Sequence, residues 1–156
     1  MDRAKATPEL FFEDFPVGEV LSYGCYHVTA EEIIEFAQEF DPQPFHVDED
    51  TAKASMLGGL AASGWHVCAI VMRMMVDGYF GRTASMGSTG VDEMKWLKPV
   101  YAGDKLSCRR TTLEARVSAK RPEMGIVKFR WELLDSKGER KADMTGINLI
   151  AARGAR

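Results

Sequence analysis

The stretch WHVCAIVMRMMV, residues 65–76, is long enough for a helix and has almost no polar face. Between Val67 and Met75 every residue except Arg73 is apolar. A helix that is apolar nearly all round belongs in the interior of a protein. The sequence therefore predicts a buried helix here, with its methionines as core residues.

Four segments with the pattern of β-strands follow this helix. The clearest is residues 126–134, in which apolar and charged residues alternate from Val127 to Leu133 with a period of two. The sequence DSKG, residues 135–138, predicts a hairpin turn. The predicted strands are residues 91–97, 105–117, 126–134 and 139–151. One apolar helix followed by consecutive antiparallel strands indicates an α+β fold, in which a sheet wraps around the helix, in a single domain of residues 1–156.

The segments before the apolar helix predict a strand and two further helices. Residues 17–29 are rich in strand formers, and Thr29 to Glu32 has the form of a capping box at a helix start. Pro42 ends this helix, and a short polar helix is expected at residues 51–55. The apolar face of the first helix consists of Ile33, Phe36, Ala37 and Phe40.

The sequence FDPQPFH, residues 40–46, predicts an irregular and stiff loop. Two prolines two positions apart make a poor helix and a poor strand. An aspartate and a histidine held on such a loop suit proton transfer, because histidine titrates near neutral pH and a carboxylate fixes its tautomer. Asp41 and His46 are therefore the candidate catalytic pair. The alternative is that Asp41 only ends the helix while His46 packs against the core.

Charge and hydropathy exclude two classes of partner. The net charge is −3, and the basic residues are scattered among acidic ones, which argues against nucleic acid. The first 15 residues lack the apolar core of a signal peptide, and no apolar run approaches membrane-spanning length. We expect a soluble cytoplasmic protein without a membrane partner.

Cysteine and histidine spacing predicts neither disulfides nor a metal site. Cys25, Cys68 and Cys108 are odd in number and widely spaced, so we expect reduced, buried thiols. The three histidines share no metal-ligand spacing.

Three motifs resemble one known family. Asp41 to Asp48, with Ala52 after it, resembles the D-x-N-P-x-H-x-D-x-x-x-A motif of the MaoC-like dehydratases, the (R)-specific enoyl-CoA hydratases. Ser63-Gly64 resembles the family's His-Gly pair, and residues 98–104, KPVYAGD, resemble its R/K-P-V-x-x-G-D turn. The three motifs stand in family order, and the similarity runs from about residue 10 to 150.

The resemblance implies a hot-dog fold and a homodimer or dimer of dimers with active sites at the subunit junction. It implies an acyl-CoA substrate and no further cofactor. Asp41 and His46 would then activate water, and the Gly64 amide at the helix start would hold the thioester oxygen. Ser63 is a candidate substrate contact or an ordinary helix cap. Trp65 and His66 are candidates for lining the acyl pocket, with packing as the alternative for Trp65 and a plain buried or surface role for His66.

The sequence departs from the family pattern at three positions. Gln43 stands where asparagine is usual, Ser63 where histidine is usual, and Met72 where serine is frequent. Two alternative functions therefore stay open beside a hydratase. One is a hot-dog acyl-CoA thioesterase, and the other is a non-catalytic acyl-CoA-binding dimer.

Overall fold

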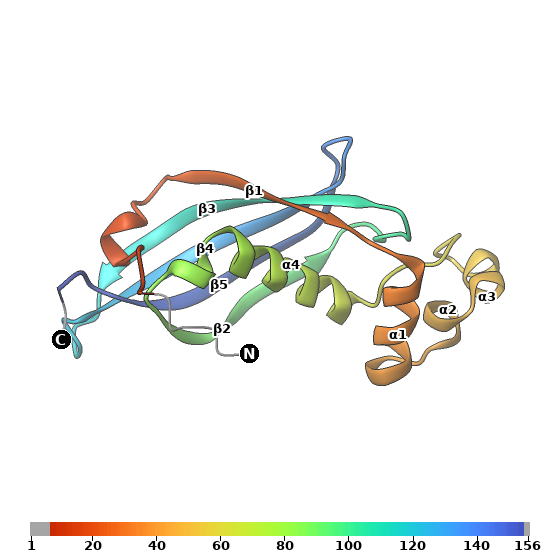
Figure 1. Ribbon diagram of the computed structural model, residues 1–156, viewed down its shortest axis with the longest axis horizontal. Coiled ribbons are helices and arrows are strands. Elements are labelled where there is room, and N and C mark those ends of the chain that lie inside the picture. The colour runs from red at the N-terminus through yellow and green to blue at the C-terminus, as the bar shows by residue number, and fades with distance from the viewer. Residues whose placement is uncertain (1–6, 155–156) are drawn as a thin grey trace.

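The computed structural model describes residues 7–154, in which one antiparallel sheet lies against one long helix (Figure 1). The five strands have the order β1-β3-β4-β5-β2, so that β1 and β2 are the two edges. The strands are β1 (Val20–His27), β2 (Ser85–Trp96), β3 (Lys105–Val117), β4 (Met124–Leu134) and β5 (Arg140–Ala151). The long helix is α4 (Gly64–Gly78), and the α+β architecture predicted from the sequence is confirmed.

Three shorter helices gather beyond the start of α4 (Figure 1). They are α1 (Ala30–Phe40), α2 (Pro44–Val47) and α3 (Glu49–Ala54), and two 3-10 turns, η1 (Phe12–Asp14) and η2 (Phe80–Arg82), complete the fold. The Thr29 hydroxyl accepts a hydrogen bond from the Glu32 amide, as predicted for the start of α1. The other half of the predicted capping box is not formed, because the Glu32 carboxylate instead accepts hydrogen bonds from the Tyr26 and Thr29 hydroxyls.

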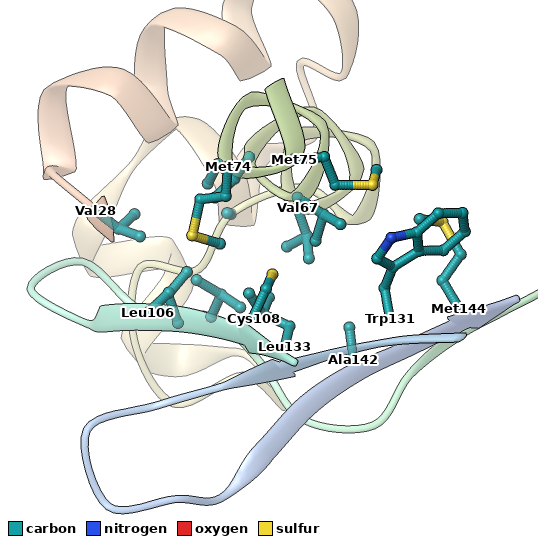
Figure 2. Close-up of a cluster of buried hydrophobic side chains, with 14 of the residues drawn as sticks. Val28, Val67, Met74, Met75, Leu106, Cys108, Trp131, Leu133, Ala142 and Met144 are labelled. Carbon is teal, nitrogen blue, oxygen red and sulfur yellow. The ribbon is translucent and has the colours of Figure 1, made fainter. Parts of the chain in front are cut away.

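The core lies between α4 and the concave face of the sheet. Figure 2 shows Val67, Met74 and Met75 of α4 opposite side chains of β3, β4 and β5. The predicted alternation in β4 is confirmed, since its four inward residues are at most 4% exposed. These residues are Val127, Phe129, Trp131 and Leu133.

Two predictions, the start of one strand and the absence of a helix in the proline-containing loop, were wrong for backbone reasons. β2 begins at Ser85 and not at residue 91, because its pairing with β5 includes residues that have no strand propensity of their own. Gly87 and Gly90 have positive φ angles, and the register shifts around them, so bulges let the chain continue as a strand. The proline-containing loop holds the short helix α2, whose first position is Pro44, where a missing amide costs no helical hydrogen bond.

Some side chains expected in the interior are exposed in the single chain. On α4, Trp65, Met72 and Val76 are 66%, 49% and 38% exposed, so this helix has one apolar face that the chain itself does not cover. Of the cysteines expected to be buried, Cys25 is exposed and Cys68 is only partly buried, while all three are free thiols. None of the helices formed by residues 7–154 is long and apolar enough to cross a membrane.

A buried arginine of β3 contacts the residue before β1 and the residue after α4. Arg110 is 2% exposed, and its guanidinium lies 4.6 Å from the centre of the Tyr79 ring and 4.9 Å from that of Phe15. It also forms an ion pair with Glu19. A charge at this depth depends on its partner, because removal of one member leaves the other uncompensated.

We predict that Glu19→Ala lowers the free energy of unfolding by about 2 kcal/mol or more, because Arg110 loses its counter-charge. Adding Arg110→Met to Glu19→Ala should restore most of the loss, since no buried charge remains. Glu9→Ala, which breaks an exposed pair with Arg82, is the matched control and should change stability by less than about 1 kcal/mol. Urea unfolding measures all four proteins, and equal small losses for Glu19→Ala and Glu9→Ala contradict this account.

Candidate active site

A cavity of about 430 Å³ opens at the start of α4. Its lining comes from three segments of the chain, residues 41–46, 61–67 and 96–100, together with Leu57. These segments carry the three motifs found in the sequence, so the fold brings Asp41, Ser63 and Lys98 to one place although they are far apart in the chain.

Asp41 is the C-terminal cap of α1, and its carboxylate accepts two short hydrogen bonds. The Ser63 hydroxyl donates to Oδ2 at 2.7 Å, and the Gln43 side-chain amide donates to Oδ1 at 2.7 Å. These bonds, first that of Ser63 and then that of Gln43, hold the pKa of Asp41 below its usual value. Asp41 is therefore an ionised acceptor in a fixed position at neutral pH.

His46 lies on α2 with its side chain buried. Its Nδ1 atom is 2.8 Å from the carbonyl oxygen of Ala61. A carbonyl only accepts hydrogen bonds, so Nδ1 carries a proton and Nε2 of the neutral ring has a free lone pair. Nε2 lies 3.5 Å from Oδ2 of Asp41, so a water molecule on the cavity side of the two atoms can contact both.

Ser63 precedes the first turn of α4 and is completely buried. The expectation of an ordinary helix cap was wrong, because its hydroxyl bonds Asp41 and makes no hydrogen bond to the first amides of α4. Those amides have no acceptor within the helix, and they lie at its positive end. The start of α4 at Gly64, on the wall of the cavity, is thus suited to holding an oxygen that gains negative charge.

The side chains of Trp65 and His66 lie in different surroundings although the two residues are neighbours in sequence. Trp65 lines the cavity, where it meets Trp96 edge to face, and it is largely exposed in the single chain. His66 is buried away from the cavity lining, where its ring stacks on Phe36 and its Nε2 lies 3.4 Å from the Glu32 carboxylate. Burial lowers the pKa of His66, and the nearby Glu32 partly opposes this. His66 therefore joins α1 to α4, and the plain buried role is its role in this chain.

Two site residues were missed in the sequence. Trp96, at the end of β2, lines the cavity and donates a hydrogen bond from its indole to the Gly64 carbonyl at 3.0 Å. Gln43 was noted only as a departure from the family pattern, and its role in binding Asp41 depends on a turn that the sequence does not define. Among residues 7–154 no group of three or more His, Cys, Asp or Glu side chains is placed to hold a metal ion.

Comparison with known proteins identifies the family. The model of the MaoC-like domain matches residues 15–128. An uncharacterized protein of Bacillus subtilis, YdeM, is 34% identical over 116 residues, which are 74% of this chain and 80% of the relative. The chain therefore belongs to the MaoC-like family.

Solved structures agree with this assignment. The crystal structure of a MaoC-like dehydratase from Rhodospirillum rubrum is 40% identical, with a TM-score of 0.86 over 92% of this chain and 98% of that one. The R-hydratase PhaJ1 from Pseudomonas aeruginosa has the same fold at 18% identity, with a TM-score of 0.73 over 92% of this chain and 86% of that one. The fold is the hot-dog fold.

We predict that Ser63→Ala raises the pKa of Asp41, because the carboxylate loses the hydrogen bond that stabilises its charged form most. Carbon-13 NMR titration of the Asp41 carboxyl measures the shift. Thr51→Ala is the matched control, since the Thr51 hydroxyl donates a comparable bond to Asp48 outside the cavity. It should raise the pKa of Asp48 and leave Asp41 unchanged. An Asp41 titration that is the same in wild type and Ser63→Ala contradicts the positioning role of Ser63.

Proposed function

We propose that this protein is an acyl-CoA hydratase or dehydratase, a hydro-lyase, that adds water reversibly to a trans-2-enoyl-CoA and gives an (R)-3-hydroxyacyl-CoA. The observation that carries the proposal is the convergence of Oδ2 of Asp41 and Nε2 of His46, 3.5 Å apart, on one cavity at the start of α4. Membership of the MaoC-like family and the fold shared with an R-hydratase support it.

In the proposed reaction, residues of this site would serve the three functions that hydration needs. A water molecule between Asp41 and His46 gives a proton to Nε2 of His46 while its oxygen bonds to C3 of the enoyl group. The electron pair of the double bond moves toward the thioester oxygen, which the first amide of α4 at Gly64 stabilises. The proton then passes to C2, so that one water has been added and both residues regain their starting charge.

Asp41 acts in this step as a fixed negative charge beside His46. Its low pKa keeps it ionised, so it stabilises the imidazolium that forms after proton transfer. The Ala61 carbonyl fixes the ring tautomer, and Ser63 and Gln43 fix the carboxylate. The pair is therefore preorganised before substrate arrives, which is the role predicted for the stiff loop.

The departures from the family pattern are compatible with this chemistry. Ser63 and Gln43 both donate hydrogen bonds to Asp41, so their side chains maintain the site. This favours a hydratase over a non-catalytic acyl-CoA-binding dimer. A thioesterase would use the same amide to polarise the thioester, but its water must attack the carbonyl carbon and release a thiol.

We predict that Asp41→Asn and His46→Gln each lower turnover on crotonyl-CoA by on the order of 10² to 10⁴, because each removes one part of the proton-transfer pair. The double variant should lose little more than the worse single variant, since both residues serve one step. Loss of the enoyl absorbance without release of free thiol is the measurement that also separates hydratase from thioesterase.

Melting temperature controls for folding, and His27→Gln, an exposed histidine on β1, controls for loss of a histidine as such. Full activity in either folded single variant, or losses that multiply in the double variant, contradicts a shared water.

We further propose that the chain forms a homodimer through α4 and β2, or a dimer of such dimers. Trp65, Met72 and Val76 make an exposed apolar stripe along α4, and β2 is an open edge strand whose side chains are almost all exposed. An edge strand can pair with its own copy about a twofold axis, which would also bring two such stripes together. A second copy therefore covers both features at once.

Sedimentation equilibrium at micromolar concentration should show at least twice the chain mass of 17.4 kDa. Met72→Glu places a charge on the stripe and should shift the protein toward monomer. Met56→Glu is the matched control, because Met56 is fully exposed in the turn after α3 and lies off the stripe. An active monomer of wild type contradicts the proposed assembly.

A further inference from the structure

The indole of Trp96 lies directly on the start of α4. Its N–H donates to the Gly64 carbonyl at 3.0 Å, and its ring meets Trp65 edge to face with centroids 5.6 Å apart. A methyl group at Gly64 would lie 2.5 Å from Cε2 and 2.7 Å from Cζ2 of Trp96, which is closer than side-chain atoms approach. The indole of Trp96 can therefore occupy this place only while position 64 is glycine.

Backbone conformation does not explain the glycine. Gly64 is absent from the positive-φ glycines of residues 7–154, and it occupies the first helical position of α4, a conformation open to any residue. The space that a side chain would take there is filled by the indole. The contact with Trp96 within the protein is therefore sufficient to require glycine at position 64.

The sheet holds the backbone of Trp96, while the hydrogen bond to the Gly64 carbonyl orients its indole. Trp96 pairs with Ala142 of β5, and the amides of Leu97 and Lys98 both donate to the Lys141 carbonyl at 2.9 and 3.1 Å. The end of β2 is thereby held while the side chain of Trp96 reaches across to α4. Trp96 remains 48% exposed and lines the cavity, so one part of the ring is available to a ligand.

We propose that Trp96 is a specificity-determining residue, which restricts this cavity to acyl thioesters without bulk next to the carbonyl carbon. This inference rests on the proposed function, which places the thioester oxygen at Gly64. An oxygen bound there brings C2 of the acyl group beside the wall that Trp96 forms. A branch at C2 then competes with the indole for space, whereas a straight acyl group does not.

The test compares crotonyl-CoA with its 2-methyl derivative, (E)-2-methylbut-2-enoyl-CoA. Trp96→Ala should raise the ratio of kcat/KM for the branched over the straight substrate by about tenfold, the usual effect of space for one methyl group. Trp96→Phe keeps most of the ring and should leave this ratio within about threefold. A ratio that Trp96→Ala does not change overturns the proposal.

A second experiment tests the contact with Gly64. Gly64→Ala should lower the melting temperature by about 4 °C or more in wild type but by much less in the Trp96→Ala background, where the added methyl group has room. It should lower kcat/KM for crotonyl-CoA by roughly tenfold in wild type and much less in Trp96→Ala. Equal losses in both backgrounds show that the indole is not what requires glycine at position 64, and they overturn the contact between Trp96 and Gly64 as the reason for this glycine.

Failure of the proposed function is distinguishable from failure of this inference. If wild type converts no enoyl thioester, the hydratase proposal fails. The role of Trp96 is then tested by calorimetry, which measures the affinity for butyryl-CoA and for 2-methylbutyryl-CoA in place of turnover. Trp96→Ala should then improve the affinity for the branched ligand relative to the straight one by about tenfold, and an unchanged relative affinity contradicts size selection by Trp96.

Discussion

The hydrogen bond from Ser63 to Asp41 connects the two parts of this protein. Ser63 begins the helix that the sheet surrounds, and Asp41 ends the helix of the smaller helical group beyond it. Because Ser63 is fully buried, its hydroxyl needs an acceptor, and Asp41 is that acceptor. The same bond lowers the pKa of Asp41 and leaves the first amides of α4 uncapped. One interaction therefore satisfies a buried group, fixes the charge of the site and leaves the first amides of α4 without a side-chain cap.

The rest of the fold serves to hold that point in place. Val67, Met74 and Met75 anchor α4 on the sheet, and Trp96 reaches from the end of β2 to the Gly64 carbonyl. His46 is fixed through the Ala61 carbonyl, on the segment that enters α4. The site is thus built from the start of a buried helix and from segments tied to it, which gives it rigid support.

The local alternation of apolar and polar residues was sufficient to predict strands that have one face packed on α4. β3 covers residues 105–117 as predicted, and β4 keeps its period of two, because one face of each strand packs on α4. The early start of β2 was hidden, since its glycines lack strand propensity and the strand exists through pairing with β5. Asp41 and His46 could be proposed as a pair because they stand in one short motif, and both line the cavity in the structure. The roles of Ser63 and Trp96 were not, since the contacts span 22 and 32 positions and leave no local pattern.

The most direct measurement of the central claim is a crystal structure of Asp41→Asn with bound crotonyl-CoA, frozen soon after soaking because turnover in this variant is slowed and not abolished. The account predicts the thioester oxygen at about 3 Å from the Gly64 amide nitrogen. It also predicts C3 of the acyl group facing a water bound between position 41 and Nε2 of His46. A thioester bound away from the start of α4, or a C3 atom that His46 and position 41 do not face, contradicts the account.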